Sequence, residues 1–416
     1  MRIAFISYEF PPHSSLGGIA TYVAQVASLL TARGHAVEVF CGLDPAANGA
    51  EADTDSPAFR IHRIRCSRAA FPQQAERSFA ARHTDEPFDV LEGPDFLAEA
   101  LPTAVQHPRV PFVVRLHTPW RIITEINTAP PPIWPTTQEI RHLWYCLRTG
   151  KPLARKPVDP LFAMEEANAR RADLILSPSA AIGHRVQHLW RLDPNRIVQV
   201  GLPFQPSDAL LAIPTEGNHH RVTYVGRLEW RKGVQDFAAA IPAVLKAFPS
   251  TKFRFVGADT PSPIEGETMS ASIKRAVGQS ALTSLEFTGA VPPAELPQLF
   301  RHTDVCVFPS RWESFGYVLL EAMAAGRACI CTSGSGLAEI AGQGQYARLV
   351  PPAAPPQLAR AVCDLLRDPA LRVKMGTLAR AEGLRRYEPG TVLGQQVDAY
   401  QQAIANHRRH SAAQPK

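Results

Sequence analysis

Two glutamates with seven residues between them, Glu313 and Glu321, lie in the segment PSRWESFGYVLLEAMAAG. A short apolar strand is predicted to end at Pro309, a turn to carry Glu313, and a helix to run on to Gly326. Eight residues of mostly helical chain place the two backbones about 10 Å apart and the carboxylates on different faces. A retaining hydrolase pair stands at about 5 to 5.5 Å, so we expect the two glutamates to bind different hydroxyl groups of one extended ligand. Taken singly, each is also typical of a solvated helix face.

Three cations follow another strand in the segment VGRLEWRKG. The strand ends at Gly226, which allows close backbone approach, and the loop carries Arg227, Arg231 and Lys232 before a helix that begins near Val234. Arginine offers a planar fork and lysine a compact charge, so together they suit a diphosphate. A basic surface loop is the alternative interpretation of any one of these residues.

A glycine pair and a histidine stand at strand ends in the first half of the chain. Gly17 and Gly18, in PPHSSLGG, allow backbone amides to lie at the positive end of the first helix. The segment is not G-x-G-x-x-G, which disfavours a nicotinamide dehydrogenase. His117 ends the strand PFVVRLH, where catalytic groups of doubly wound sheets gather. A single histidine there is also common as a structural residue.

Possible metal ligands are sparse in the sequence. Cys329 and Cys331 form a C-x-C inside the apolar run ACICTS, with no second Cys/His pair nearby, so core packing is favoured. Asp53–Asp55 resembles a metal-binding D-x-D, but its polar surroundings predict a solvated loop. We therefore expect no metal site.

Short apolar strands alternate with helical segments along the chain. This pattern is typical of parallel sheets with crossover helices. The chain of 416 residues is long enough for two such domains. A Pro- and Gly-rich stretch near residues 201–221 separates two strand series. We predict an α/β protein with two Rossmann-like domains facing across a cleft. The predicted units are residues 1–205, residues 206–390, and a helix and tail at 391–416 that returns to the first domain.

Charge and hydropathy restrict the partners and the compartment. The net charge of +6 is not gathered into a basic stripe, which disfavours a nucleic acid partner. The amino terminus lacks the h-region of a signal peptide, and no apolar run reaches about 18 residues. We expect a cytoplasmic protein.

One stretch, residues 120–159, breaks the strand and helix rhythm with prolines and with Trp120, Trp134 and Trp144. It is either an irregular loop with a short helix near residues 139–148 or a lip that binds the acceptor or touches the inner face of a membrane.

Four segments together resemble glycosyltransferase family 4, the large retaining group with the GT-B fold. They are the opening GGIATYVAQVASLLTARGHAVEVF, then VGRLEWRKGV, FTGAVPPAELPQLF and PSRWESFGYVLLEAMAAG. The resemblance runs from residue 1 to about residue 390. It implies that the protein transfers a hexose-type sugar from a nucleotide-diphosphate sugar to a saccharide or lipid-linked saccharide acceptor, and that it needs no metal cofactor.

The resemblance also assigns roles to the matching residues of the second domain. Arg227 and Lys232 correspond to residues that bind the donor diphosphate. Glu313 corresponds to a residue that meets the transferred sugar, and Glu321 to one that meets the nucleotide ribose. The residues between the two glutamates, Ser314, Phe315 and Gly316, are expected to contact the donor as well.

In the first domain, the resemblance places His117 against the sugar near the reacting centre, and Gly17 and Gly18 in a loop that closes over the phosphates. The acceptor is then expected to attack the face from which the nucleoside diphosphate leaves, with no covalent enzyme intermediate. Two alternatives remain: a nucleotide-sugar epimerase of the same fold, and a non-catalytic protein that binds nucleotide sugars.

Overall fold

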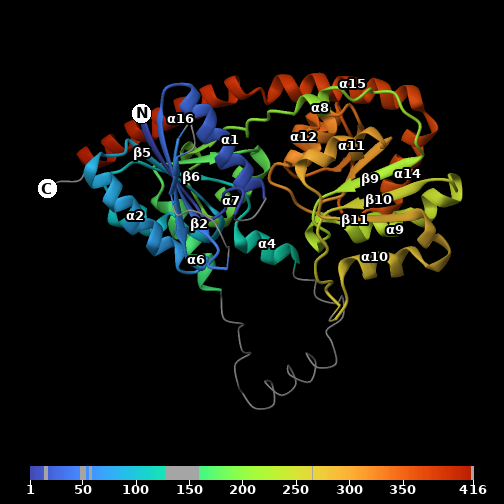
Figure 1. Ribbon diagram of the computed structural model, residues 1–416, viewed down its shortest axis with the longest axis horizontal. Coiled ribbons are helices and arrows are strands. Elements are labelled where there is room, and N and C mark those ends of the chain that lie inside the picture. The colour runs from blue at the N-terminus through green and yellow to red at the C-terminus, as the bar shows by residue number, and fades with distance from the viewer. Residues whose placement is uncertain (14–16, 47–52, 56–58, 128–158, 265, 414–416) are drawn as a thin grey trace, which may run out of the picture.

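The computed structural model describes residues 1–13, 17–46, 53–55, 59–127, 159–264 and 266–413. Two β-sheets with helices on their faces form two lobes, joined by helices that run along one side of both (Figure 1). The predicted loop or acceptor-binding lip falls largely on residues 128–158, including Trp134 and Trp144, which lie outside the described residues. None of the described helices is long and apolar enough to span a membrane.

The first sheet has the strand order β3-β4-β2-β1-β5-β6-β7-β8. All adjacent pairs are parallel except β3 with β4. Every residue of β1 is buried, as expected for a strand covered by helices on both faces. The strands are β1 (Arg2–Ser7), β2 (Ala36–Leu43), β3 (Asp53–Asp55), β4 (Arg60–Arg65), β5 (Val90–Pro94), β6 (Phe112–Arg115), β7 (Leu174–Ser177) and β8 (Ile197–Gln199).

The prediction of a solvated loop at Asp53–Asp55 is wrong. These residues form β3, which pairs antiparallel with β4 at the edge of the first sheet, Thr54 opposite Ile61. Aspartate is depleted in strands, but an edge strand satisfies its backbone groups by pairing with a neighbour that is remote from the local sequence pattern.

The second sheet has the order β11-β10-β9-β12-β13-β14, and all its pairs are parallel. The order reverses between β9 and β12, so their carboxyl ends flank the crevice where such sheets bind ligands. The strands are β9 (Arg221–Val225), β10 (Lys252–Val256), β11 (Leu285–Gly289), β12 (Val305–Phe308), β13 (Ala328–Thr332) and β14 (Arg348–Val350). Two doubly wound α/β domains are thereby confirmed.

Helices cover both sheets, and α16 contacts α1, β6 and β7 of the first domain after following α15 over the second (Figure 1). The helices of the first domain are α1 (Gly18–Ala32), α2 (Phe71–Asp85), α3 (Leu101–Gln106), α4 (Trp120–Asn127), α6 (Pro160–Arg171) and α7 (Ala180–Trp190). The later helices are α8 (Asp208–Leu211), α9 (Val234–Ala247), α10 (Met269–Val277), α11 (Leu296–Arg301), α12 (Tyr317–Ala324), α13 (Gly336–Ile340), α14 (Pro355–Arg367), α15 (Pro369–Arg386) and α16 (Pro389–Ala413). Short 3-10 helices are η1 (Phe96–Ala98), η2 (Pro194–Arg196), η3 (Trp230–Lys232), η4 (Gln279–Ser284), η5 (Pro293–Glu295) and η6 (Gly342–Gly344).

Candidate active site

The cations after β9 and the glutamate after β12 meet because these two strands are neighbours in the second sheet. The 3-10 helix η3 turns into α9 at Gly233, whose φ of 67° is left-handed. A Cβ atom at Gly233 would lie 2.0 Å from the carbonyl oxygen of Pro309, so only glycine lets the two loops approach this closely. The close approach places Lys232 beside Glu313.

Lys232 and Glu313 form an ion pair through Nζ and Oε2, and each side chain is 16% exposed. Burial lowers the pKa of Lys232, although Glu313 opposes the shift. Burial raises the pKa of Glu313, but the charges of Lys232 and Arg231 outweigh it, so the net pKa lies below its usual value. The lowered pKa keeps the Glu313 carboxyl charged at neutral pH, and the ion pair holds the Lys232 Nζ atom in a fixed place.

The other two cations of this loop differ in accessibility. The Arg227 side chain is 63% exposed and lies 3.4 Å from Glu229. Arg231 is buried, and it donates to the carbonyl of Trp312 at 3.2 Å and to the Glu229 carboxylate at 2.6 Å. Arg227 is thus free to reach a ligand, whereas Arg231 joins the two loops. The residue types and spacing grouped both with Lys232, whereas the family resemblance gave a role to Arg227 and none to Arg231.

Glu321 lies on α12, where its Oε2 atom is buried and has no hydrogen-bond partner among the described residues. Burial raises the pKa of its carboxyl to about 7. One helical turn earlier, the buried hydroxyl of Tyr317 also has no partner in the described part of the chain. Residues four apart share a helix face, so the two groups suit a ligand with paired hydroxyls. Tyr317 was not predicted as a site residue, although its four-residue spacing to Glu321 is a signal in the sequence.

Phe315 and Gly316 shape the turn into α12. The Phe315 ring is buried and meets the rings of Tyr317 and Tyr387 edge to face at 5.5 and 5.2 Å. Gly316 has a φ of 123°, and a Cβ atom there would lie 2.5 Å from the Leu337 side chain. Close packing of α12 on α13 therefore requires this glycine.

His117 lies across the interdomain contact from Glu313. The residues that follow them in the sequence are in contact: the hydroxyl oxygens of Thr118 and Ser314 are 2.6 Å apart. The His117 amide donates to Asp95 at 2.9 Å, and its ring meets Tyr22 edge to face at 5.5 Å. Burial, with the charge of Arg115, lowers the pKa of His117 to about 3. The imidazole is therefore neutral at physiological pH.

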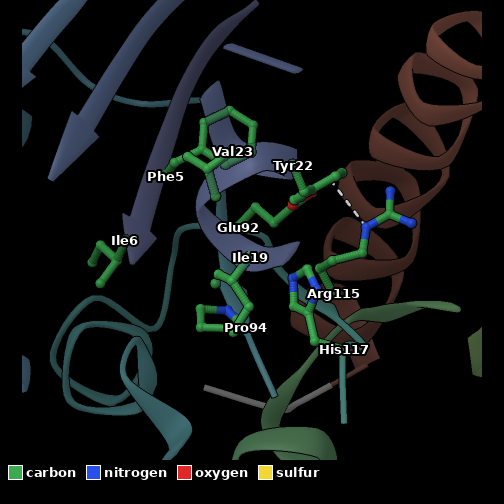
Figure 2. A pocket seen from close by; sticks show the side chains of 10 residues that line it. Phe5, Ile6, Ile19, Tyr22, Val23, Glu92, Pro94, Arg115 and His117 are labelled. Carbon is green, nitrogen blue, oxygen red and sulfur yellow. Dashed lines mark hydrogen bonds between the residues drawn. The ribbon is translucent and has the colours of Figure 1, made fainter. Parts of the chain in front are cut away.

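A small pocket beside His117 connects it to the start of α1 (Figure 2). Ile19 and Tyr22 of α1 line it together with Arg115 and His117. Gly17 caps α1, and a Cβ atom at Gly18 would meet nothing within 4 Å. Among the described residues, the space beside Gly18 is thus open, and Ile19 places the start of α1 beside the pocket that His117 lines.

A buried polar network lies beneath His117. Arg115 donates to the Tyr22 hydroxyl at 3.0 Å (Figure 2). It also donates to the carbonyl of Val200 at 2.7 Å and to Gln396 at 2.9 Å. The Glu92 carboxylate accepts from Tyr22 and Tyr400, both at 2.6 Å. The network joins β5, β6 and α1 to α16.

Among the described residues, no group of three or more His, Cys, Asp or Glu side chains is arranged to bind a metal ion. Cys329 and Cys331 are fully buried in a hydrophobic cluster that contains residues of both domains.

The sequence and the fold both match known glycosyltransferases. The family described as "Glycosyl transferase 4-like domain" matches residues 17–203, and "Glycosyl transferases group 1" matches residues 219–368. Glycogen synthase of Mycobacterium tuberculosis is 26% identical over 441 residues, which cover 100% of this chain and 97% of the relative.

Two solved structures show the same fold. Sucrose-phosphate synthase from Thermosynechococcus elongatus superposes with a TM-score of 0.71 at 20% identity, over 97% of this chain and 100% of that one. HepE from Anabaena, in complex with UDP and glucose, superposes with a TM-score of 0.63 at 18% identity, over 96% and 98%. The chain is therefore a glycosyltransferase of the GT-B type and belongs to glycosyltransferase family 4.

Proposed function

We propose that the protein transfers a hexose, with retention of anomeric configuration, from a nucleotide-diphosphate sugar to a saccharide or lipid-linked saccharide. The observation that carries the proposal is the partly buried Lys232–Glu313 ion pair after the carboxyl ends of β9 and β12. The exposed Arg227 stands on the same loop. A relative of the same fold, HepE, holds UDP and glucose, which supports a donor of this class.

In the proposed reaction, Arg227 and Lys232 neutralise the diphosphate as the bond between the anomeric carbon and the phosphate oxygen breaks. The acceptor hydroxyl attacks the same face, its oxygen bonds to the anomeric carbon, and the departing phosphate oxygen takes its proton. Glu313 accepts a hydrogen bond from a sugar hydroxyl while it orients Lys232. The neutral His117 is suited to hydrogen-bond the sugar without adding positive charge.

The test is direct incubation with UDP-glucose, GDP-mannose and ADP-glucose, with and without oligosaccharide acceptors. Release of nucleoside diphosphate together with a longer saccharide supports transfer, and NMR of the new anomeric proton supports or refutes retention. An epimerised sugar nucleotide formed without any acceptor would overturn the proposal in favour of an epimerase.

Affinity for UDP-glucose is expected to rise with pH. Burial raises the pKa of Glu321 to about 7, and ribose hydroxyls donate best to the charged carboxylate. The charged fraction grows about tenfold between pH 6 and pH 8, so Kd should fall about tenfold. Calorimetric titration with UDP-glucose measures this, because its diphosphate does not titrate in that range. A Glu321→Gln variant should give a flat profile; an equal slope in the variant would contradict the assignment.

Transfer is expected to continue in EDTA. Arg227 and Lys232 supply the positive charge that a divalent cation would otherwise bring to the leaving diphosphate. The rate of UDP release should agree within about twofold before and after dialysis against EDTA. Loss of activity that Mg²⁺ or Mn²⁺ restores would contradict this arrangement.

A further inference from the structure

The residue after Glu313 is held by the first domain through two hydrogen bonds. The hydroxyl of Ser314 lies 2.6 Å from that of Thr118, and the Ser179 hydroxyl donates to the Ser314 carbonyl at 2.6 Å. All three side chains are at most 9% exposed. Thr118 in turn donates to the carbonyl of His117 at 2.6 Å, so a chain of hydrogen bonds runs from the Glu313 loop to the backbone of His117.

A carboxylate of the second domain caps a helix of the first. The two oxygens of Glu339, on α13, accept from the amides of Ala180 and Ala181 at the start of α7, both at 2.8 Å. Gln199 adds a third hydrogen bond to the same carboxylate at 3.1 Å. Helix amino termini favour negative charge, so this contact stabilises the arrangement in which the domains touch.

The two parts of the second domain that make these contacts, the Glu313 loop and α13, are packed on each other. The Gly336 amide, at the start of α13, donates to the carbonyl of Glu313 at 2.8 Å. A Cβ atom at Gly336 would lie 2.2 Å from the Ser314 carbonyl oxygen, so α13 is packed directly on the loop that carries Glu313. Movement of Glu339 away from α7 would therefore carry Ser314 away from Thr118.

A cation–π contact follows the same boundary. The Arg185 guanidinium, on α7, lies 4.4 Å from the centre of the Trp312 ring. Trp312 is 8% exposed and packs in a hydrophobic cluster that, among the described residues, otherwise consists of first-domain side chains. The residues on either side of Glu313, Trp312 and Ser314, thus both contact the first domain.

The name interdomain latch is used below for four side chains, Thr118, Ser179, Ser314 and Glu339. We propose that the interdomain latch sets His117 and Glu313 in register when the two domains close around the donor. Ser314 is then a positioning residue, because both its hydroxyl and its carbonyl are engaged by the first domain. The catalytic role of this alignment of His117 and Glu313 rests on the proposed function. The interdomain latch itself can be tested without any substrate.

Amide hydrogen exchange of the full chain tests the latch. Thr118→Val keeps the shape of the side chain and removes the hydroxyl, whereas Thr118→Ser keeps the hydroxyl. If the latch opens as a unit, loss of one hydrogen bond should speed exchange at Ala180 and Ala181 about 2- to 12-fold in Thr118→Val and leave it unchanged in Thr118→Ser. These amides contact Glu339 and not Thr118, so the effect must pass through domain opening.

The matched control is Thr84→Val, because the exposed Thr84 hydroxyl bonds only within α2, to the carbonyl of Ala80. Unchanged exchange at Ala180 and Ala181 in Thr118→Val would overturn the proposal. So would equal acceleration in Thr84→Val, since that result would mean a general loss of stability.

Kinetics with UDP-glucose test the register. Thr118→Val should lower kcat about 2- to 12-fold while the Kd for UDP stays within about twofold, and Thr118→Ser should restore kcat. Wild-type kcat in Thr118→Val, or a Kd that weakens in parallel, would overturn the positioning role. If the wild-type chain released no UDP from UDP-glucose, the proposed function would fail with this donor, and the exchange measurement would still decide the latch.

Discussion

Replacement of Lys232 with alanine is expected to lower the rate of sugar transfer by about 10- to 150-fold or more. In the proposed reaction Lys232 contacts the donor diphosphate, and loss of one such charge-assisted contact accounts for that range. The contact strengthens as the leaving group gains charge, so the effect should fall mainly on kcat. The variant also leaves Glu313 without its closest cation in a site where both side chains are 16% exposed, which adds to the loss.

The measurement is kcat for UDP release at saturating UDP-glucose with an active acceptor. Lys246→Ala is the matched control, because Lys246 is exposed on α9 and should tolerate the change. Thermal unfolding of Lys232→Ala should remain cooperative and near the wild-type temperature. Wild-type turnover in a folded Lys232→Ala protein would remove Lys232 from the site.

Replacement of Arg115 with methionine is expected to destabilise the first domain by about 3 to 5 kcal/mol, the usual cost of leaving a buried charge without its partner. Glu92 is fully buried, and Arg115 supplies the positive charge in its network. The same change removes hydrogen bonds to the carbonyl of Val200 and to Gln396 of α16. Hydrogen exchange in α16 should therefore rise more than exchange in α9 of the second domain.

The loss should depend on pH. Burial already raises the pKa of Glu92 despite Arg115, and removal of the guanidinium raises it further. A carboxyl whose pKa is raised in the folded state favours folding when protonated, so stability falls as pH rises. The melting temperature of Arg115→Met should consequently drop more at pH 8 than at pH 5.

A second substitution provides the rescue. Arg115→Met combined with Glu92→Gln removes both charges and should recover part of the lost stability. Arg360→Met, on the exposed surface of α14, should change stability by less than about 0.5 kcal/mol. A melting temperature of Arg115→Met equal to that of the wild type at pH 8 would show that the network is not needed for the fold.

The class of fold, and the loops proposed to bind the donor, could be predicted from the sequence. Apolar strands alternating with amphipathic helices require parallel sheets, and the carboxyl ends of such strands meet at one edge. Gly226 and Lys232 after one strand, and Glu313 after another, could therefore be placed at the ligand-binding edge of the sheet from the sequence. The local signals were enough because each residue's position follows from the end of its own strand.

The folded structure was needed to tell which polar groups are engaged by other parts of the protein and which stay accessible. Ser314 and Arg231 have the same sequence context as Glu313 and Lys232, yet partners in other loops engage them. Arg115 lies 281 residues from Gln396, and Thr118 lies 196 residues from Ser314. Contacts between such distant residues leave no period or spacing in the sequence, because they depend on how complete domains pack. The same reason explains β3, whose pairing with β4 overrides the turn-forming character of Asp53–Asp55.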